Sequence, residues 1–215
     1  MHNPWPQVSA IGALAVIAVV ACANAAQGAP SGAVRASPDT GPARYTPADV
    51  QFMSGMISHH AQAVLMAGWA PTHGASAAVR TLCERIVVGQ RDEIAFMQRW
   101  LGERHEVVPP ADPRGHMMAG MDRPMLMPGM LTPEQMAQLD GARGPEFDRS
   151  FLKFMIQHHR GAITMVEQLL STQGAAQDGL VFQFASGVNA DQTTEIDRMT
   201  RMLDALSQTS QRSPQ

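Results

Sequence analysis

Two adjacent histidine pairs, each with methionines at helical spacing, are the residues of this chain best suited to chemistry. Met56 lies three residues before His59, and Met66 lies seven residues after it. The same pattern recurs without a gap 99 positions further along the chain. Helical periodicity places these side chains on one face of each segment. The candidate metal ligands are Met56, His59, His60, Met66, Met155, His158, His159 and Met165.

The donor types indicate which metal ion these clusters would bind. Thioether sulfur with imidazole suits copper, and favours Cu(I) over Cu(II), whereas zinc sites use thiolate, imidazole and carboxylate. Iron is the second possibility, but a di-iron bundle needs a Glu-x-x-His motif, which this sequence lacks. Neighbouring His59 and His60 diverge by ~100° on a helix, so we do not expect both to hold one ion. A site shared between the two copies is the alternative.

Core packing is the competing explanation for the same residues. Methionine fills gaps in helical cores, and a lone histidine on an apolar face is usually a hydrogen-bonded core residue. Here, however, a histidine pair flanked by methionine is repeated in register. Burying such a pair is costly unless its nitrogens have partners, so the repetition favours metal binding.

Two acidic residues occupy matching positions in the segments that pair with the histidine helices. Glu93 and Glu195 are 102 positions apart, in step with several neighbours that also repeat at this offset. Each is a candidate to accept a hydrogen bond from a ligand imidazole and so to set its tautomer. The alternative is a carboxylate on a solvated helix face. Cys83 corresponds to Ala185 and is interpreted as a small buried hydrophobic residue.

The connection between the two copies is unusually rich in methionine. It spans residues 102–131 and is rich in proline, which predicts a connection without regular periodicity. Two interpretations stand: the segment recruits copper at weak, exchangeable sites, or its methionines cover an apolar surface. The possible auxiliary ligands are His116, Met117, Met118, Met121, Met125, Met127 and Met130.

The elements that must position these residues are helices. Thr46 with Pro47, and Thr132 with Pro133, are typical helix starts because a threonine N-cap precedes a proline at the first position. We expect helices over residues 46–69, 76–101, 132–140, 145–170 and 175–206. The hairpins 46–101 and 144–206 are copies of one unit too small to bury its own apolar face. The chain is therefore predicted to be all-α, with residues 46–207 forming a four-helix bundle of two duplicated hairpins.

The N-terminal segment predicts export. Residues 1–25 contain an apolar run that is shorter than the ~20 residues a transmembrane helix requires, which favours a signal peptide. Ala21-Cys22 ends a lipobox-like sequence, so Cys22 is a candidate lipid anchor; an ordinary cleavage site near Ala25 is the alternative. Residues 26–45 are rich in Ala, Gly, Pro and Ser and are predicted to be a flexible tether. We expect a periplasmic or cell-surface location.

Charge and cysteine content argue against a nucleic-acid partner and against a disulfide in the folded domain. The chain has 215 residues, with 16 Lys plus Arg against 19 Asp plus Glu and no basic run, so no nucleic-acid partner is expected. Beyond the N-terminal segment only Cys83 remains, which rules out an intrachain disulfide in the folded domain.

The sequence resembles the domain of unknown function 305 family. The resemblance rests on Phe52 to Met66, on Phe151 to Met165, and on the run Met127-Pro128-Gly129-Met130-Leu131-Thr132. It implies a ferritin-like four-helix bundle, an exported location, and copper binding with a role in copper tolerance. The resemblance supports the eight candidate ligands and implies no catalytic residue.

The function we expect is that of an exported copper-binding protein, not an enzyme. It would sequester copper or transfer it to a partner protein. The paired motifs supply no carboxylate and no set of convergent acids and bases for catalysis. The alternatives are a metal-dependent redox enzyme, of di-iron or copper type, and a structural helical bundle without metal.

Overall fold

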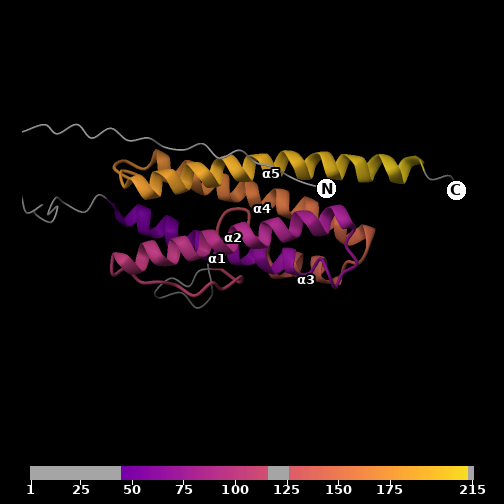
Figure 1. Cartoon of the computed structure of the whole chain (residues 1–215), viewed down its shortest axis with the longest axis horizontal. Coiled ribbons are helices and arrows are strands. Elements are labelled where there is room, and N and C mark those ends of the chain that lie inside the picture. The colour runs from indigo at the N-terminus through magenta and orange to yellow at the C-terminus, as the bar shows by residue number, and fades with distance from the viewer. Residues whose placement is uncertain (1–44, 116–125, 213–215) are drawn as a thin grey trace, which may run out of the picture. The chain divides into compact units, whose positions relative to one another are not determined.

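The computed structural model describes residues 45–115 and 126–212, and side chains to residue 208. These residues form five helices and no strand, as Figure 1 shows. The predicted signal segment, residues 26–44 of the predicted tether and Cys22 lie outside the described residues. So do five candidate ligands of the connection: His116, Met117, Met118, Met121 and Met125. The helices are α1 (Pro47–Gly68), α2 (Ala77–Glu103), α3 (Pro133–Gly141), α4 (Pro145–Ser171) and α5 (Gly179–Arg212).

Capping residues explain where the first helices begin. Thr46 and Asp49 form a reciprocal capping box at the start of α1, and Thr132 and Gln135 form another at the start of α3. Ser76 accepts a hydrogen bond from the Val79 amide at the start of α2. The two threonine–proline starts expected from the sequence are therefore confirmed.

The last helix begins later than the sequence indicated. We expected it from about residue 175, but residues 172–178 form the turn after α4 and α5 starts at Gly179. Asp178 is the reason, because its carboxylate accepts hydrogen bonds from the amides of Leu180 and Val181. Ala176 adopts a positive φ of 55°, which is incompatible with a helix.

The helices pair as two hairpins. α1 packs along α2, and α4 packs along α5, with the α1–α4 contact joining the pairs, as Figure 1 shows. Each copy of the sequence repeat is thus one hairpin. This arrangement is compatible with the expected four-helix bundle, with α3 as an additional short helix in the connection.

Two buried aspartates tie the hairpins together reciprocally. Asp49 at the start of α1 accepts a hydrogen bond from the Ala176 amide, in the turn after α4. Asp148 at the start of α4 accepts hydrogen bonds from the Ser76 amide, in the turn after α1. Because the start of each helix meets the end of the other, α1 and α4 run antiparallel. Their midpoints are thereby brought together.

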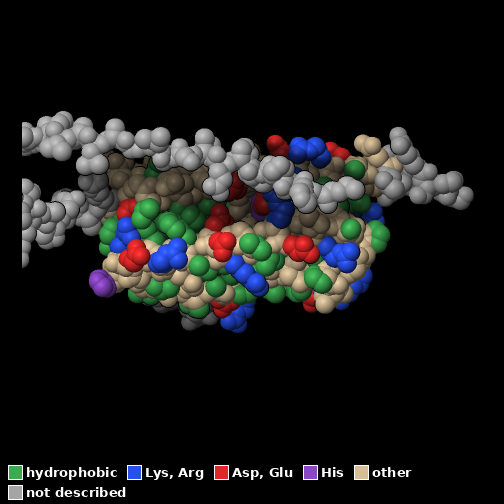
Figure 2. All heavy atoms as spheres, viewed as in Figure 1, with side chains coloured by type: hydrophobic (Ala, Val, Ile, Leu, Met, Phe, Trp, Pro, Cys, Tyr) green, Lys and Arg blue, Asp and Glu red, His purple; other side chains and the backbone are tan. Residues whose placement is uncertain are grey.

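The core is apolar, whereas the surface of the protein carries positive and negative side chains. Trp100, Phe147 and Phe151 are among the largest fully buried side chains. Cys83 is buried as expected, and burial raises the pKa of its thiol to about 12. Acidic and basic side chains are intermixed on the face shown in Figure 2. Among the described helices, none is both long and apolar enough to span a membrane.

Candidate metal centre

The two histidine pairs meet where α1 and α4 contact each other. The ring centroids of His59 and His158 are 3.8 Å apart, with an interplanar angle of 39°. His60 and His159 lie beside them, each 6.2 Å from its neighbour in the pair. All four side chains are completely buried. The geometry therefore unites one pair from each hairpin in a single cluster.

A carboxylate from the partner helix lies against each outer histidine. Nε2 of His159 donates a hydrogen bond to Glu195 Oε2 at 2.7 Å. Nε2 of His60 lies 2.9 Å from Glu93 Oε2, although this contact lacks the alignment of a good hydrogen bond. Both glutamates therefore lie against a histidine ring. An imidazole that presents Nε2 to a carboxylate keeps its Nδ1 lone pair for another partner.

Several histidine nitrogens in this cluster have no hydrogen-bond partner. Among the described residues, they include Nδ1 of His59, His60 and His159, and both ring nitrogens of His158. A buried polar group without a partner costs about 1–3 kcal/mol, so such groups are rare in folded proteins. Neutral imidazole nitrogens gathered in a dry core are suited to donate lone pairs to a soft metal ion. The donor set therefore fits copper.

The electrostatics keep the two central rings neutral. Burial lowers the pKa of His59 to about 3, and repulsion from His60 adds to this effect, while a hydrogen bond to Pro128 opposes it. Burial also holds the pKa of His158 well below its ordinary value, and repulsion from the other three histidines adds to this effect, while a weaker contact with the His59 backbone opposes it. Neutral imidazole is the protonation state that binds a metal ion.

The stability of the metal-free protein is expected to fall as the pH drops below about 6.5. The unfolded chain protonates histidine near 6.5, whereas folded His59 stays neutral down to about 3. The unfolded state therefore binds more protons in this window, and stability is lost at about 1.4 kcal/mol per pH unit for each such ring. Urea unfolding between about pH 7 and pH 4 measures the slope. A His59→Leu/His158→Leu variant should show a shallower slope; an unchanged slope would contradict the assignment.

The candidate methionines lie on both sides of the histidine cluster. Met56 and Met165 belong to one buried apolar cluster, and Met66 and Met155 belong to the other. Each cluster thus combines sulfurs from both hairpins, as the antiparallel helices require. Within the described ranges, no three His, Cys, Asp or Glu side chains form a group that could hold a metal ion. A site built here would use sulfur together with imidazole.

Two methionines of the connection are packed against this core. Met130 is buried, and Met127 is partly buried against the same cluster as Met56. The connection therefore returns to the core at these two residues.

Sequence reasoning missed several polar residues near the site. The Pro128 carbonyl accepts a hydrogen bond from His59 Nε2 at 3.0 Å. Gln90 and Gln192 are buried, and both amide atoms of Gln90 and the Oε1 of Gln192 lack partners. The signal for these glutamines was their repetition at the same offset as Glu93 and Glu195.

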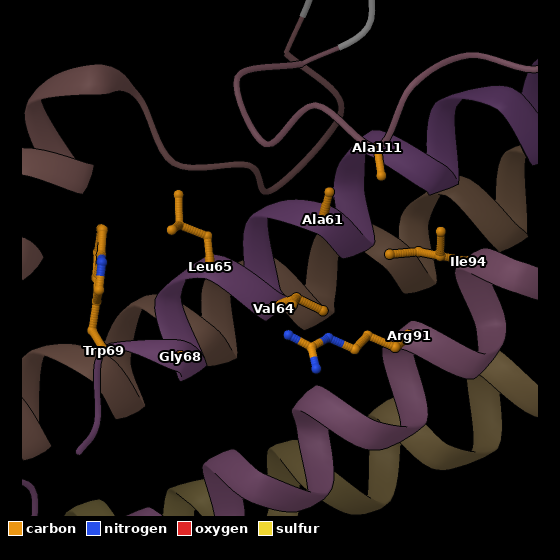
Figure 3. A pocket seen from close by; sticks show the side chains of 8 residues that line it. All are labelled: Ala61, Val64, Leu65, Gly68, Trp69, Arg91, Ile94 and Ala111. Carbon is orange, nitrogen blue, oxygen red and sulfur yellow. The ribbon is translucent and has the colours of Figure 1, made fainter. Parts of the chain in front are cut away.

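A groove between α1 and α2 does not have the chemistry of a metal site. Its volume is about 510 Å³, and Figure 3 shows its side chains. The lining contains no histidine and no methionine, and Arg91 is its one charged side chain. The residues that line it are Ala61, Val64, Leu65, Gly68, Trp69, Arg91, Ile94 and Ala111.

The fold and the site together define a class of protein. It is an all-helical protein made of two similar hairpins, with a buried cluster of histidine and methionine where the first helices of the hairpins meet. The chain belongs to the domain of unknown function 305 (DUF305) family, whose model matches residues 49–203. The family resemblance seen in the sequence is thereby confirmed.

Solved structures of the same fold support this assignment. A DUF305 protein from Streptomyces coelicolor, described as a candidate secreted protein, is 28% identical, with a TM-score of 0.64, over 77% of this chain and 96% of that one. A DUF305 fragment from Deinococcus radiodurans is 27% identical, with a TM-score of 0.62, over 75% of this chain and 98% of that one.

A third group of similar structures is of CopM, which has been solved in Cu(I)-bound, Cu(II)-bound and silver-bound forms. The Cu(I)-bound form is 23% identical, with a TM-score of 0.56, over 73% of this chain and 96% of that one. At this identity the likeness shows a shared fold. A comparison with curated proteins gave no match.

Proposed function

We propose that this protein binds copper through the histidine and methionine side chains where its hairpins meet, and that it sequesters the ion or transfers it to a partner protein. The observation that carries the proposal is the cluster of four buried histidines with unpartnered nitrogens. We include in the proposal that the hairpins form a ferritin-like four-helix bundle. The proposed ligands are Met56, His59, His60, Met66, Met155, His158, His159 and Met165.

Three further points support copper as the ion. Thioether and imidazole donors match Cu(I) better than zinc or iron. Glu93 and Glu195 lie against the outer histidines, as carboxylates do when they orient a ligand ring. CopM, which shares the fold, has been solved with copper and with silver bound.

The proposed role is binding rather than catalysis, at an exported location. The four histidines are completely buried, whereas a catalytic metal site needs a position that a substrate can reach. The apolar N-terminal run supports export to the periplasm or the cell surface, with Cys22 as a possible lipid attachment site. The similar Streptomyces protein, described as a candidate secreted protein, supports the same location.

The purified protein is expected to bind Cu(I) and Ag(I) far more tightly than Zn(II) or Fe(II). Soft thioether sulfur contributes little to binding the harder ions, whereas it stabilises monovalent copper and silver. Anaerobic titration of Cu(I) against a chromophoric chelator, followed by competition with each of the other ions, measures this order. A Cys83→Ala variant controls for binding by the free thiol. Displacement of Cu(I) by zinc or iron would refute the proposal.

A further inference from the structure

The segment Met127-Pro128-Gly129-Met130 forms a tight turn, here named the Met-Pro-Gly-Met turn. The Met130 amide donates to the Met127 carbonyl at 3.1 Å, and Gly129 has a φ of 77°. Proline at the second position and glycine at the third are the residues that such a turn requires. The Met127 amide also contacts the Met130 sulfur at 3.4 Å. The sequence of this segment therefore specifies its shape.

The turn is docked on α4 through backbone contact. A β-carbon on Gly161 would lie 1.9 Å from the Pro128 carbonyl oxygen, so only glycine permits this approach. Gln157 adds a hydrogen bond from its Nε2 to the Gly129 carbonyl at 3.3 Å. The turn thus lies directly against the backbone of α4, next to its histidine pair.

The turn is also fastened to α1. Gln62 Oε1 accepts a hydrogen bond from the Leu131 amide at 2.7 Å, and Gln62 Nε2 donates to the Leu131 carbonyl at 3.1 Å. Because this pairing uses both the amide and the carbonyl of one residue, it holds the chain just after the turn in a fixed position. His59 Nε2 donates to the Pro128 carbonyl at 3.0 Å.

The docked turn accounts for differences between the two copies of the repeat. Gln62 corresponds to Gly161 at the offset of 99, and these positions hold the turn from opposite sides. Gly55 corresponds to Phe154. The candidate ligands are conserved between the copies, whereas these positions are specialised to receive one turn that has no second copy.

The turn brings an additional sulfur to one side of the cluster. A β-carbon on Gly55 would lie 3.1 Å from Met127 Sδ and 3.6 Å from Met165 Cε, so these two methionines meet over Gly55. Gly55 lies one helical turn before His59, and Met165 is a proposed ligand. Both methionines pack with the cluster that contains Met56.

We infer that Met127 is a further copper ligand, held beside His59 by the docked Met-Pro-Gly-Met turn, so that the two sides of the pseudo-symmetric site are unequal. The inference rests on the proposed copper-binding function. Its basis is the partly buried thioether beside Met165, together with the Pro128 contact that leaves only Nδ1 of His59 available. On the other side, the cluster with Met66 and Met155 packs against Met136 of α3 and not against Met127.

The test compares Met127→Leu with Met136→Leu, a matched control on α3. Met136 is also a partly buried methionine, but it packs in the other apolar cluster. Leucine keeps the apolar volume and removes the sulfur, so both variants should retain the melting temperature of the metal-free protein. Met127→Leu should weaken the tightest Cu(I) site by about tenfold or more and lower the sulfur count in Cu K-edge absorption spectra. Met136→Leu should change neither quantity.

The outcomes distinguish the inference about Met127 from the proposal that the protein binds copper. If the unmodified protein binds Cu(I) but Met127→Leu retains its affinity and sulfur count, Met127 is a packing residue and the inference is wrong. A large fall in the melting temperature of Met127→Leu with intact copper binding would overturn it in the same way. If the unmodified protein binds no Cu(I), the proposed function itself fails.

Discussion

Replacing His158 with leucine is expected to stabilise the metal-free protein and to lower its copper stoichiometry. His158 is completely buried, and neither of its ring nitrogens makes a hydrogen bond of good geometry within the described residues. Removing these buried polar nitrogens should raise the free energy of unfolding by about 1–3 kcal/mol, because leucine fills a similar space without a polar group. For a protein of this size, each kcal/mol raises the melting temperature by roughly 2–4 °C. Thermal unfolding without metal and anaerobic Cu(I) titration measure the two effects on one sample.

His73→Leu is the matched control for this experiment. His73 is also buried, but its Nδ1 contacts the Thr72 hydroxyl and its Nε2 donates to Asp140, each at 3.0 Å. Its removal should therefore lower the melting temperature and leave copper binding unchanged. If His158→Leu instead lowers stability and binds copper normally, His158 is a structural core residue. If the melting temperature rises for His158→Leu and falls for His73→Leu, packing alone would not explain the difference.

The sequence was sufficient to predict the helices and the equivalent places of the two histidine pairs. Thr46 and Thr132 marked helix starts because capping depends on residues within one turn of the chain. The duplication predicted that two histidine pairs would occupy equivalent places in two hairpins, and the structure brings His59 and His158 into contact. The repetition of Glu93 as Glu195 made both residues candidates for a contact with histidine, and in the structure both carboxylates lie against a histidine.

The docking of the connection and the start of α5 could not be predicted, because they depend on contacts between residues far apart in the chain. Gly161 reads as an ordinary helical glycine until the Pro128 carbonyl is placed against it. The connection was expected to have no regular periodicity, and its residue Leu131 is held by Gln62, which lies 69 positions away. The start of α5 depends partly on a local cap, Asp178, and partly on a distant contact, because the Ala176 amide donates to Asp49 of the other hairpin.

Asp49→Ala is expected to destabilise the protein by about 3 kcal/mol, the cost of leaving a buried hydrogen-bond network without its acceptor. The Asp49 carboxylate accepts from the Thr46 amide at 2.7 Å, from the Thr46 hydroxyl at 2.8 Å and from the Ala176 amide at 2.7 Å. Asp148→Ala should cost less, because Asp148 accepts from the Ser76 amide alone, at 3.2 and 3.3 Å.

The positive φ of Ala176 explains why Asp49 should matter more than its counterpart. A left-handed alanine costs free energy that its surroundings must offset, and the short hydrogen bond that the Ala176 amide donates to Asp49 supplies that restraint. Asp49→Asn should recover part of the loss, since its amide oxygen can still accept from Ala176. Urea unfolding measures each variant against Asp92→Ala, an exposed acidic control on α2 expected to change stability by less than about 0.5 kcal/mol. Equal losses for Asp49→Ala and Asp92→Ala would mean that these reciprocal contacts do not hold the hairpins together, and that apolar packing between α1 and α4 alone aligns the histidines.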